Sequence, residues 1–132
     1  MRNLSFLPAA VWTLVIAVAC LISSDEIEKV NFADIKYNDK FLHALFYFLF
    51  TIFWFQFLRA FLKNADVRKI RIYVFLLALL YGSIIEICQA TFSSGRSGDI
   101  LDVVANSTGS ALAILALWLF KRNKTQKYDP LT

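Results

Sequence analysis

Residues 41–58 read FLHALFYFLFTIFWFQFL, a continuous apolar run that contains no Lys, Arg, Asp or Glu. A helix of about 20 apolar residues is long enough to cross the hydrocarbon core of a bilayer, which is roughly 30 Å thick. Three further stretches have similar length and character, at residues 4–22, 70–90 and 100–120. We therefore predict an all-α integral membrane bundle of four transmembrane helices.

The composition of the whole chain supports this prediction. The 132 residues are 58% hydrophobic and 18% charged, and so short a chain cannot bury that much apolar surface in a water-soluble core. We expect one domain over residues 1–122, followed by a polar tail without fixed structure at residues 123–132. The net charge of +4 resides in short basic blocks beside the apolar stretches. We therefore expect membrane lipids, and no nucleic acid, as partners.

The first apolar stretch also has features of a signal peptide. Arg2 precedes it, and the sequence AVAC at residues 17–20 is compatible with a lipoprotein-type cleavage. Because the run is longer than the roughly 7–15 apolar residues of a signal peptide, we favour a retained helix. Cys20 and Cys88 lie near the same predicted end of the bundle, and we favour two buried thiols over a disulfide.

The basic residues are distributed unevenly between the connections. Ten of the fourteen Lys and Arg residues lie at the N-terminus, in the second connection or in the tail. The first and third connections carry the other four, and the first also holds five Asp and Glu residues. Because Lys and Arg resist translocation, we predict that both termini are cytoplasmic. The first and third connections then face outward.

Polar side chains recur at helical spacing near the outward ends of the last three stretches. Residues three or four positions apart share one face of a helix. Such sets are Asp39, His43 and Tyr47 in the second stretch, Glu86 and Gln89 in the third, and Asp102, Asn106 and Ser110 in the fourth. A carboxylate such as Glu86, about one turn inside the membrane boundary, is costly unless it is paired or hydrated. We therefore treat it as a functional candidate.

Charged residues beside these sets complete a group at the predicted outer boundary. With His43 neutral, the group has a net charge of −2 and consists of Asp39, Glu86, Asp99 and Asp102 against Lys40 and Arg96. Such a surplus of acid raises the pKa of neighbouring groups or holds a cation. Structural roles also remain open. Asp99 followed by Asp102 is typical of a helix N-terminus, and Lys40 is typical of a membrane interface.

The order of these residues is similar to that of the VanZ-like family of membrane proteins. The resemblance covers about residues 38–113 and rests on Asp39-Lys40-Phe41-Leu42-His43 with Tyr47, on Glu86-Ile87-Cys88-Gln89, and on Arg96 followed by Asp99, Asp102, Asn106 and Gly109. It implies a multi-pass protein of the bacterial plasma membrane. The family is named for a protein of glycopeptide-resistance gene clusters, and its founding member is linked to low-level resistance to teicoplanin, which carries a fatty acyl chain. The resemblance implies this context and no particular reaction.

We favour a non-enzymatic function, in which the outward polar group recognises an envelope lipid or a lipidated glycopeptide. Arg96 and Lys40 would bind phosphate or carboxylate, while the acidic residues would orient these cations or accept hydrogen bonds from a sugar. The predicted ligand-binding residues are Asp39, Lys40, His43, Tyr47, Glu86, Gln89, Arg96, Asp99, Asp102 and Asn106.

Two other functions remain open. The first is a membrane-embedded enzyme that modifies an envelope lipid, with His43 or Glu86 as general base and Arg96 stabilising an oxyanion. A single His among carboxylates also suits a divalent metal, although we favour a protein without a cofactor. The second is a polar network that only fixes the packing of the helices.

Overall fold

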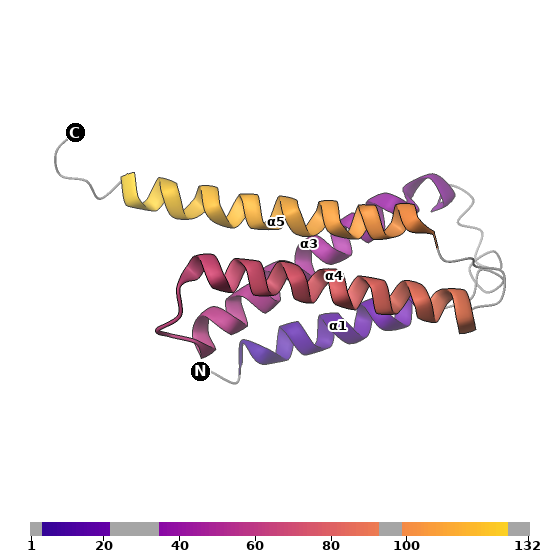
Figure 1. The fold of residues 1–132 in the computed structure, drawn as a ribbon, viewed down its shortest axis with the longest axis horizontal. Helices are drawn as coiled ribbons and strands as arrows, with labels where there is room; N and C mark the ends of the chain where they lie inside the picture. The colour runs from indigo at the N-terminus through magenta and orange to yellow at the C-terminus, as the bar shows by residue number, and fades with distance from the viewer. Residues whose placement is uncertain (1–3, 22–34, 93–98, 127–132) are drawn as a thin grey trace.

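The computed structural model describes residues 4–21, 35–92 and 99–126, and it is helical over nearly all of them. Four helices form the bundle: α1 (Phe6–Leu21), α3 (Ile35–Phe61), α4 (Val67–Phe92) and α5 (Ile100–Gln126). The predicted all-α class is therefore confirmed. Successive helices alternate in direction, so α1 begins and α5 ends at the same end of the bundle (Figure 1).

Three of the helices are long and apolar enough to cross a membrane, so the chain is a multi-pass membrane protein. Their spans are Asp39–Phe61 on α3, Val67–Phe92 on α4 and Ile100–Phe120 on α5. α1 is apolar as predicted but shorter, with 16 residues, or about 24 Å at the usual helical rise. α5 continues to Gln126, into the region predicted to be a polar tail, and residues 127–132 lie outside the described residues.

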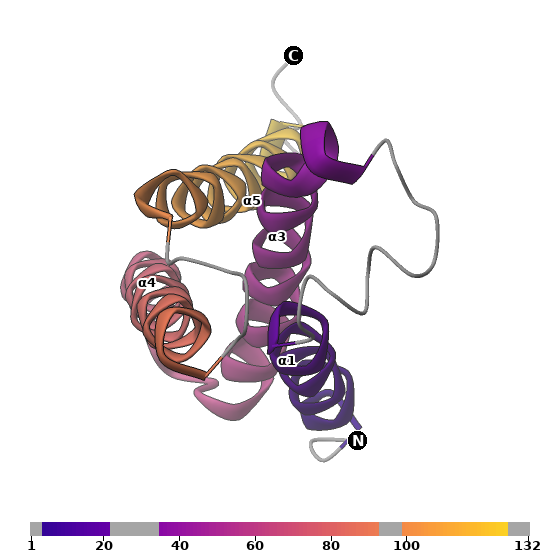
Figure 2. The ribbon, with the colours of Figure 1, turned by 90° about the vertical axis from the view of Figure 1, so that its right-hand side faces the viewer.

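α3 is the central helix of the bundle. It contacts α1, α4 and α5, and its contact with α5 is the most extensive. It crosses the bundle diagonally, from the start of α5 towards the start of α4 (Figures 1 and 2). The N-terminal half of α3 therefore lies against α5, where the predicted polar residues of both helices meet.

α3 and α5 approach each other closely at Gly109. A Cβ atom at this position would overlap the backbone of Ala44, so the contact requires glycine. Small residues permit such close helix packing in lipid, and Ala113, one turn further along α5, is fully buried. The contact brings His43, the neighbour of Ala44, next to Asn106, which lies about one turn before Gly109.

The middle of the bundle is aromatic and holds α1 in place. Phe50 and Tyr81 stack with ring centroids 5.2 Å apart, and the buried ring of Tyr47 packs against both. Trp54 Nε1 donates a hydrogen bond to Thr13 Oγ1 (3.1 Å), and Tyr81 OH donates one to the Thr13 carbonyl (2.6 Å). These bonds attach the short helix α1 to both α3 and α4.

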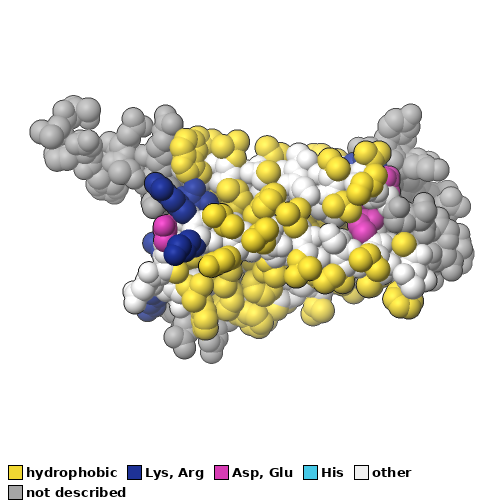
Figure 3. Space-filling view, viewed as in Figure 1, with side chains coloured by type: hydrophobic (Ala, Val, Ile, Leu, Met, Phe, Trp, Pro, Cys, Tyr) yellow, Lys and Arg dark blue, Asp and Glu magenta, His cyan; other side chains and the backbone are white. Residues whose placement is uncertain are grey.

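Charged side chains gather at the two ends of the bundle, and a band of apolar side chains lies between them (Figure 3). The end where α3 is followed by α4 is mainly basic, with exposed Arg59, Lys63, Arg68 and Lys69. The opposite end carries the acidic side chains that were predicted to face outward. The fold thus contains the charge separation on which the predicted orientation rests, while the orientation itself stays a prediction.

Candidate functional site

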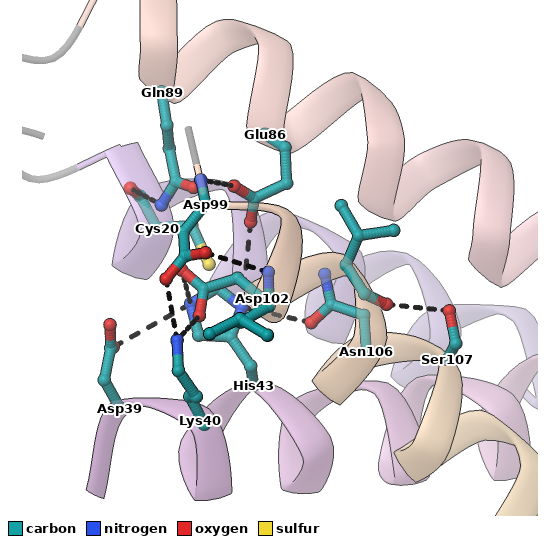
Figure 4. A network of polar contacts seen from close by, with 12 residues as sticks. Cys20, Asp39, Lys40, His43, Glu86, Gln89, Asp99, Asp102, Asn106 and Ser107 are labelled. Carbon is teal, nitrogen blue, oxygen red and sulfur yellow. Dashed lines mark hydrogen bonds and ion pairs between the residues drawn. The ribbon is translucent and has the colours of Figure 1, made fainter. Parts of the chain in front are cut away.

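Polar residues from three helices meet at the acidic end of the bundle (Figure 4). We call them the polar cluster, which consists of Asp39, Lys40 and His43 on α3, Glu86 and Gln89 on α4, Asp99 immediately before α5, and Asp102 and Asn106 on α5. All were predicted to bind a ligand. Helical spacing places them on common faces, and the bundle brings together residues as far apart as 63 positions in sequence.

His43 forms the floor of the polar cluster and is 3% exposed. Its Nδ1 lies 3.0 Å from Asn106 Oδ1. Because an amide oxygen only accepts hydrogen bonds, this contact requires the proton to be on Nδ1. When the ring is neutral, the other nitrogen, Nε2, therefore carries a lone pair.

Three carboxylates surround the His43 ring. Nε2 lies 3.8 Å from Asp39 Oδ1 and 3.9 Å from Asp102 Oδ2, and Nδ1 lies 4.0 Å from Glu86 Oε1. These separations are longer than hydrogen bonds but short enough for electrostatic coupling. The single histidine of the chain is therefore coupled to acidic residues on all three helices.

Lys40 connects α3 to α5 at the rim of the polar cluster. Its Nζ donates hydrogen bonds to Asp99 Oδ2 at 2.8 Å and to Asp102 Oδ1 at 3.0 Å. The side chains of Lys40 and Asp99 are 48% and 41% exposed, whereas that of Asp102 is 11% exposed. The polar cluster thus has an open rim and a closed floor.

Asp99 has a structural role as well as a place in the polar cluster. Its Oδ1 accepts a hydrogen bond from the Leu101 amide at 2.8 Å, which caps α5 as the sequence predicted. The hydrogen bond from Lys40, followed by that from the Leu101 amide, lowers the pKa of the Asp99 carboxyl below its ordinary value. Asp99 is therefore held ionised at neutral pH.

α4 contributes a buried carboxylate and a link to α1. Glu86 Oε2 accepts a hydrogen bond from the backbone N–H of Asp99 at 3.3 Å. Gln89 Nε2 donates to the backbone carbonyl of Cys20 at 2.7 Å, near the end of α1. The sequence did not predict this second contact, because a backbone acceptor has no side-chain signature. No disulfide joins Cys20 to Cys88 in the structure.

One other predicted ligand-binding residue, Tyr47, lies deeper in the bundle than the polar cluster. Tyr47 is fully buried about one turn deeper than His43. A Cβ atom on Gly82 would lie 3.3 Å from the Tyr47 ring and 3.2 Å from Asn106 Nδ2, so this glycine leaves room for both. Arg96 lies outside the described residues, and its role stays a prediction.

Hydroxyl and amide groups continue from the polar cluster into the core. Four hydroxyl and amide atoms along this strip are buried without a hydrogen-bond partner in the described part of the chain: Tyr47 OH, Thr51 Oγ1, Asn106 Nδ2 and Ser110 Oγ. Each such group costs about 1–3 kcal/mol. Thr51 was not among the predicted residues, although its position four residues after Tyr47 continues the same helix face. This strip gives the bundle unused hydrogen-bonding capacity beneath the polar cluster.

The chemistry of the polar cluster follows from its donors and acceptors. Its carboxylates can accept hydrogen bonds from a polar headgroup, and His43 can accept a proton at Nε2. Asp39, His43 and Asp102 also place one ligand atom each within 4.8 Å of one another. Imidazole and carboxylate are common ligands of divalent metal ions.

Comparison with protein families gives one result that covers most of the chain. Residues 5–121 match the model of the VanZ/LLP1 family. This match extends well beyond residues 38–113, on which the resemblance in sequence rests, and includes α1. No curated protein and no solved structure matches the chain.

Proposed function

Since this chain belongs to the VanZ/LLP1 family, we propose that it is a bacterial plasma-membrane protein whose polar cluster binds the headgroup of an envelope amphiphile. The amphiphile is either an envelope lipid or a lipidated glycopeptide. The observation that carries the proposal is the polar cluster itself, a polar site with an open rim and a buried floor at the end of an apolar bundle.

The surface beside the rim suits an amphiphile. Phe41, next to Lys40 in sequence, is 66% exposed, and Ile100, next to Asp99, is 73% exposed. In a bilayer, such side chains on membrane-spanning helices face the lipid tails. A molecule with its acyl chain among these tails would have its headgroup beside the rim.

The charge of the polar cluster indicates how a headgroup would be held. Among the described residues, four carboxylates face one ammonium group, and Lys40 is already shared by Asp99 and Asp102. We therefore infer that hydroxyl or amino groups of the headgroup donate hydrogen bonds to the carboxylates. The anion-binding role predicted for Arg96 is a separate part of the proposal.

Native mass spectrometry tests headgroup binding. Wild type, Asp102→Asn and Asp66→Asn would be released gently from nanodiscs made of bacterial lipid. Asp66 is a matched control, because it is exposed at the basic end and accepts a hydrogen bond from the nearby Arg68 amide. We expect a lipid adduct on wild type and Asp66→Asn and its loss from Asp102→Asn. Equal adducts on all three proteins would contradict the proposal.

The glycopeptide form of the proposal has its own comparison. Teicoplanin carries a fatty acyl chain and vancomycin does not. Comparing their binding therefore distinguishes recognition of an amphiphile from recognition of the peptide part alone. We expect nanodiscs that contain the protein to retain more teicoplanin than protein-free nanodiscs do. Nanodiscs that contain Asp102→Asn should retain only as much as protein-free nanodiscs. Equal retention of vancomycin would show that the acyl chain has no role.

A lipid-modifying enzyme is the second candidate, and one observation favours it. The contact with Asn106 orients the buried His43 ring so that Nε2 offers a lone pair among carboxylates, as a general base requires. Envelope lipids from cells that lack the protein, overproduce it or carry His43→Ala would be compared. A His43-dependent change in one lipid supports catalysis, and identical profiles argue against it.

We further propose that both termini are cytoplasmic and that the polar cluster faces outward. Lys63 and Thr91 are exposed near opposite ends of the bundle, so each can be replaced by cysteine in a chain without Cys20 and Cys88. A membrane-impermeant maleimide should label Thr91→Cys in intact cells and label Lys63→Cys only after permeabilisation. The reverse pattern would contradict the orientation.

A further inference from the structure

We infer that Asp39, His43 and Asp102 form a binding site for a divalent transition-metal ion. Asp39 and His43 are one helical turn apart on α3, and Asp102 faces them from α5 (Figure 4). Their ligand atoms lie within 4.8 Å of one another. The site therefore joins the two helices that have the most extensive contact in the bundle.

The contact between His43 and Asn106 supports a cation at this point. His43 Nδ1 donates its hydrogen to Asn106 Oδ1, so Nε2 of the neutral ring has no hydrogen to offer to Asp39 or Asp102. Three lone-pair donors thus point at one another in a place where the ring is 3% exposed. A cation between the three atoms would stabilise such an arrangement.

The distances from His43 Nε2 to the two carboxylates are only slightly longer than those between the ligand atoms of a bound metal ion. Zn²⁺ and Mn²⁺ hold nitrogen and oxygen ligands at about 2.0–2.2 Å, so neighbouring ligand atoms lie roughly 3.0–3.5 Å apart. The corresponding distances from His43 Nε2 are 3.8 Å to Asp39 and 3.9 Å to Asp102. Asp39 is 31% exposed at the rim, where a rotation of its side chain closes the site.

The outer contacts of the three ligands match those of established metal sites. A metal-bound histidine usually donates its other ring N–H to an acceptor, as His43 does to Asn106. A metal-bound carboxylate is usually hydrogen-bonded in turn, as Asp102 Oδ1 is by Lys40. An imidazole with two carboxylates favours Mn²⁺, Fe²⁺ or Zn²⁺ over Mg²⁺ and Ca²⁺, which prefer oxygen ligands alone.

Three protein ligands leave at least one coordination position open. We infer that this position accepts an oxygen atom of the headgroup, from a hydroxyl or a phosphate. This second step rests on the proposed function, whereas the metal site does not. The competing explanation for the three converging atoms is a proton on Nε2, which would make His43 an imidazolium that needs no metal.

Metal binding to purified protein, without any amphiphile, separates these explanations. Wild type would be stripped with a chelator in nanodiscs and titrated with Mn²⁺, with free Mn²⁺ followed by electron paramagnetic resonance, and then with Zn²⁺ in competition. We expect one Mn²⁺ per chain, displaced by Zn²⁺. If wild type binds neither ion, the inference is overturned and the proton explanation stands.

Variants place the metal on these residues. Asp39→Asn, at the partly exposed rim, should abolish binding and leave the fold intact, whereas Asp66→Asn should bind as wild type does. Asn106→Ala removes an outer contact and should weaken binding roughly 10–100-fold. His43→Gln should also abolish binding, with thermal unfolding as the check that it folds. Unchanged binding by folded Asp39→Asn would overturn the inference.

The role of the metal in headgroup binding is measured separately. The lipid adduct of wild type would be recorded before and after chelation. Loss of the adduct on chelation, and its return with Zn²⁺, supports metal-mediated recognition. An adduct unaffected by chelation overturns the bridging role, and metal binding without any adduct refutes the proposed function but leaves the metal site standing.

Discussion

The two charged ends of the bundle are built in different ways. At the basic end, the charged side chains that the structure describes come from the short segment 59–71 and are mostly exposed, and Asp66 accepts a hydrogen bond from a residue two positions away. At the acidic end, the polar cluster gathers residues from three helices, and Lys40 bonds to Asp99 across 59 positions. One end is a local pattern in the sequence, and the other is a product of tertiary structure.

This difference indicates different reasons for the charges. Exposed charges contribute only about 0–1 kcal/mol per pair, so the basic end needs no explanation beyond orientation in the membrane. Charges inside a membrane-spanning bundle are costly to bury and are usually functional. We therefore propose that the acidic end carries the function, and we expect substitutions there to have the larger and more specific effects.

The largest expected effect comes from adding a methyl group at Gly109, where α3 and α5 are in close contact. Gly109→Ala would place a methyl group against the backbone of Ala44 and push the two helices apart. We expect a loss of about 1–3 kcal/mol in the free energy of unfolding in mixed micelles, as for other overpacked sites. Thr108→Ala is the control, because Thr108 is exposed and bonds to its own helix. Equal stability of both variants would show that the contact at Gly109 is not tight.

A smaller effect is expected from removing the partner of the buried histidine. Asn106→Ala leaves His43 Nδ1 without its acceptor, which should cost about 1–3 kcal/mol. This cost is reduced because the unpartnered Nδ2 of Asn106 is removed as well. Ser107→Ala is the matched control, since the Ser107 hydroxyl bonds to the Val103 carbonyl of the same helix. Chemical unfolding of the two variants measures the difference. Similar losses would mean that the polar cluster is no more cooperative than an ordinary helix surface.

Most of the fold could be predicted because lipid imposes a simple rule on the sequence. A helix in lipid satisfies its own backbone, so long apolar runs reveal the helices directly. α1 is the exception, because it has only 16 residues. Hydrogen bonds from Trp54 and Tyr81 on other helices hold it in the bundle. Such side-chain contacts between helices leave no periodic signal in the sequence of α1.

The members of the polar cluster could be predicted, but their pairing could not. Spacing of three or four residues placed Asp39 with His43 and Asp102 with Asn106 on common faces. Which face meets which depends on the crossing of α3 and α5, and that crossing depends on the contact at Gly109. The placement of His43 Nε2 beside Asp39 and Asp102 is a consequence of this three-dimensional pairing.

At the basic end, the expected effect is that of a helix cap. Asp66 Oδ1 accepts a hydrogen bond from the Arg68 amide at 2.9 Å, at the start of α4. Asp66→Ala should therefore lower the free energy of unfolding by about 1 kcal/mol. Binding of Mn²⁺ and of lipid should be unchanged, because the residue lies at the opposite end from the polar cluster. Weaker binding by this variant would show that the two ends are coupled.

The smallest effect, and the most diagnostic one, concerns the dependence of stability on pH. The pKa of Asp99 is lowered mainly by Lys40, so the ionised pair stabilises the folded state above the ordinary aspartate pKa of 3.8. This contribution is lost as the pH falls through the lower pKa of the folded state, where Asp99 becomes protonated. Because both side chains are nearly half exposed, solvent screens the pair and the effect is small.

Lys40→Ala should therefore be less stable than wild type at about pH 7, and the difference should shrink as the pH falls through the lowered pKa of Asp99. Lys63→Ala removes an exposed lysine from the opposite, basic end of the bundle and should show no such dependence. Midpoints of thermal unfolding for the three proteins from neutral to acidic pH measure the effect. A pH-independent gap for Lys40→Ala would mean that its aliphatic chain, rather than its charge, joins α3 to α5.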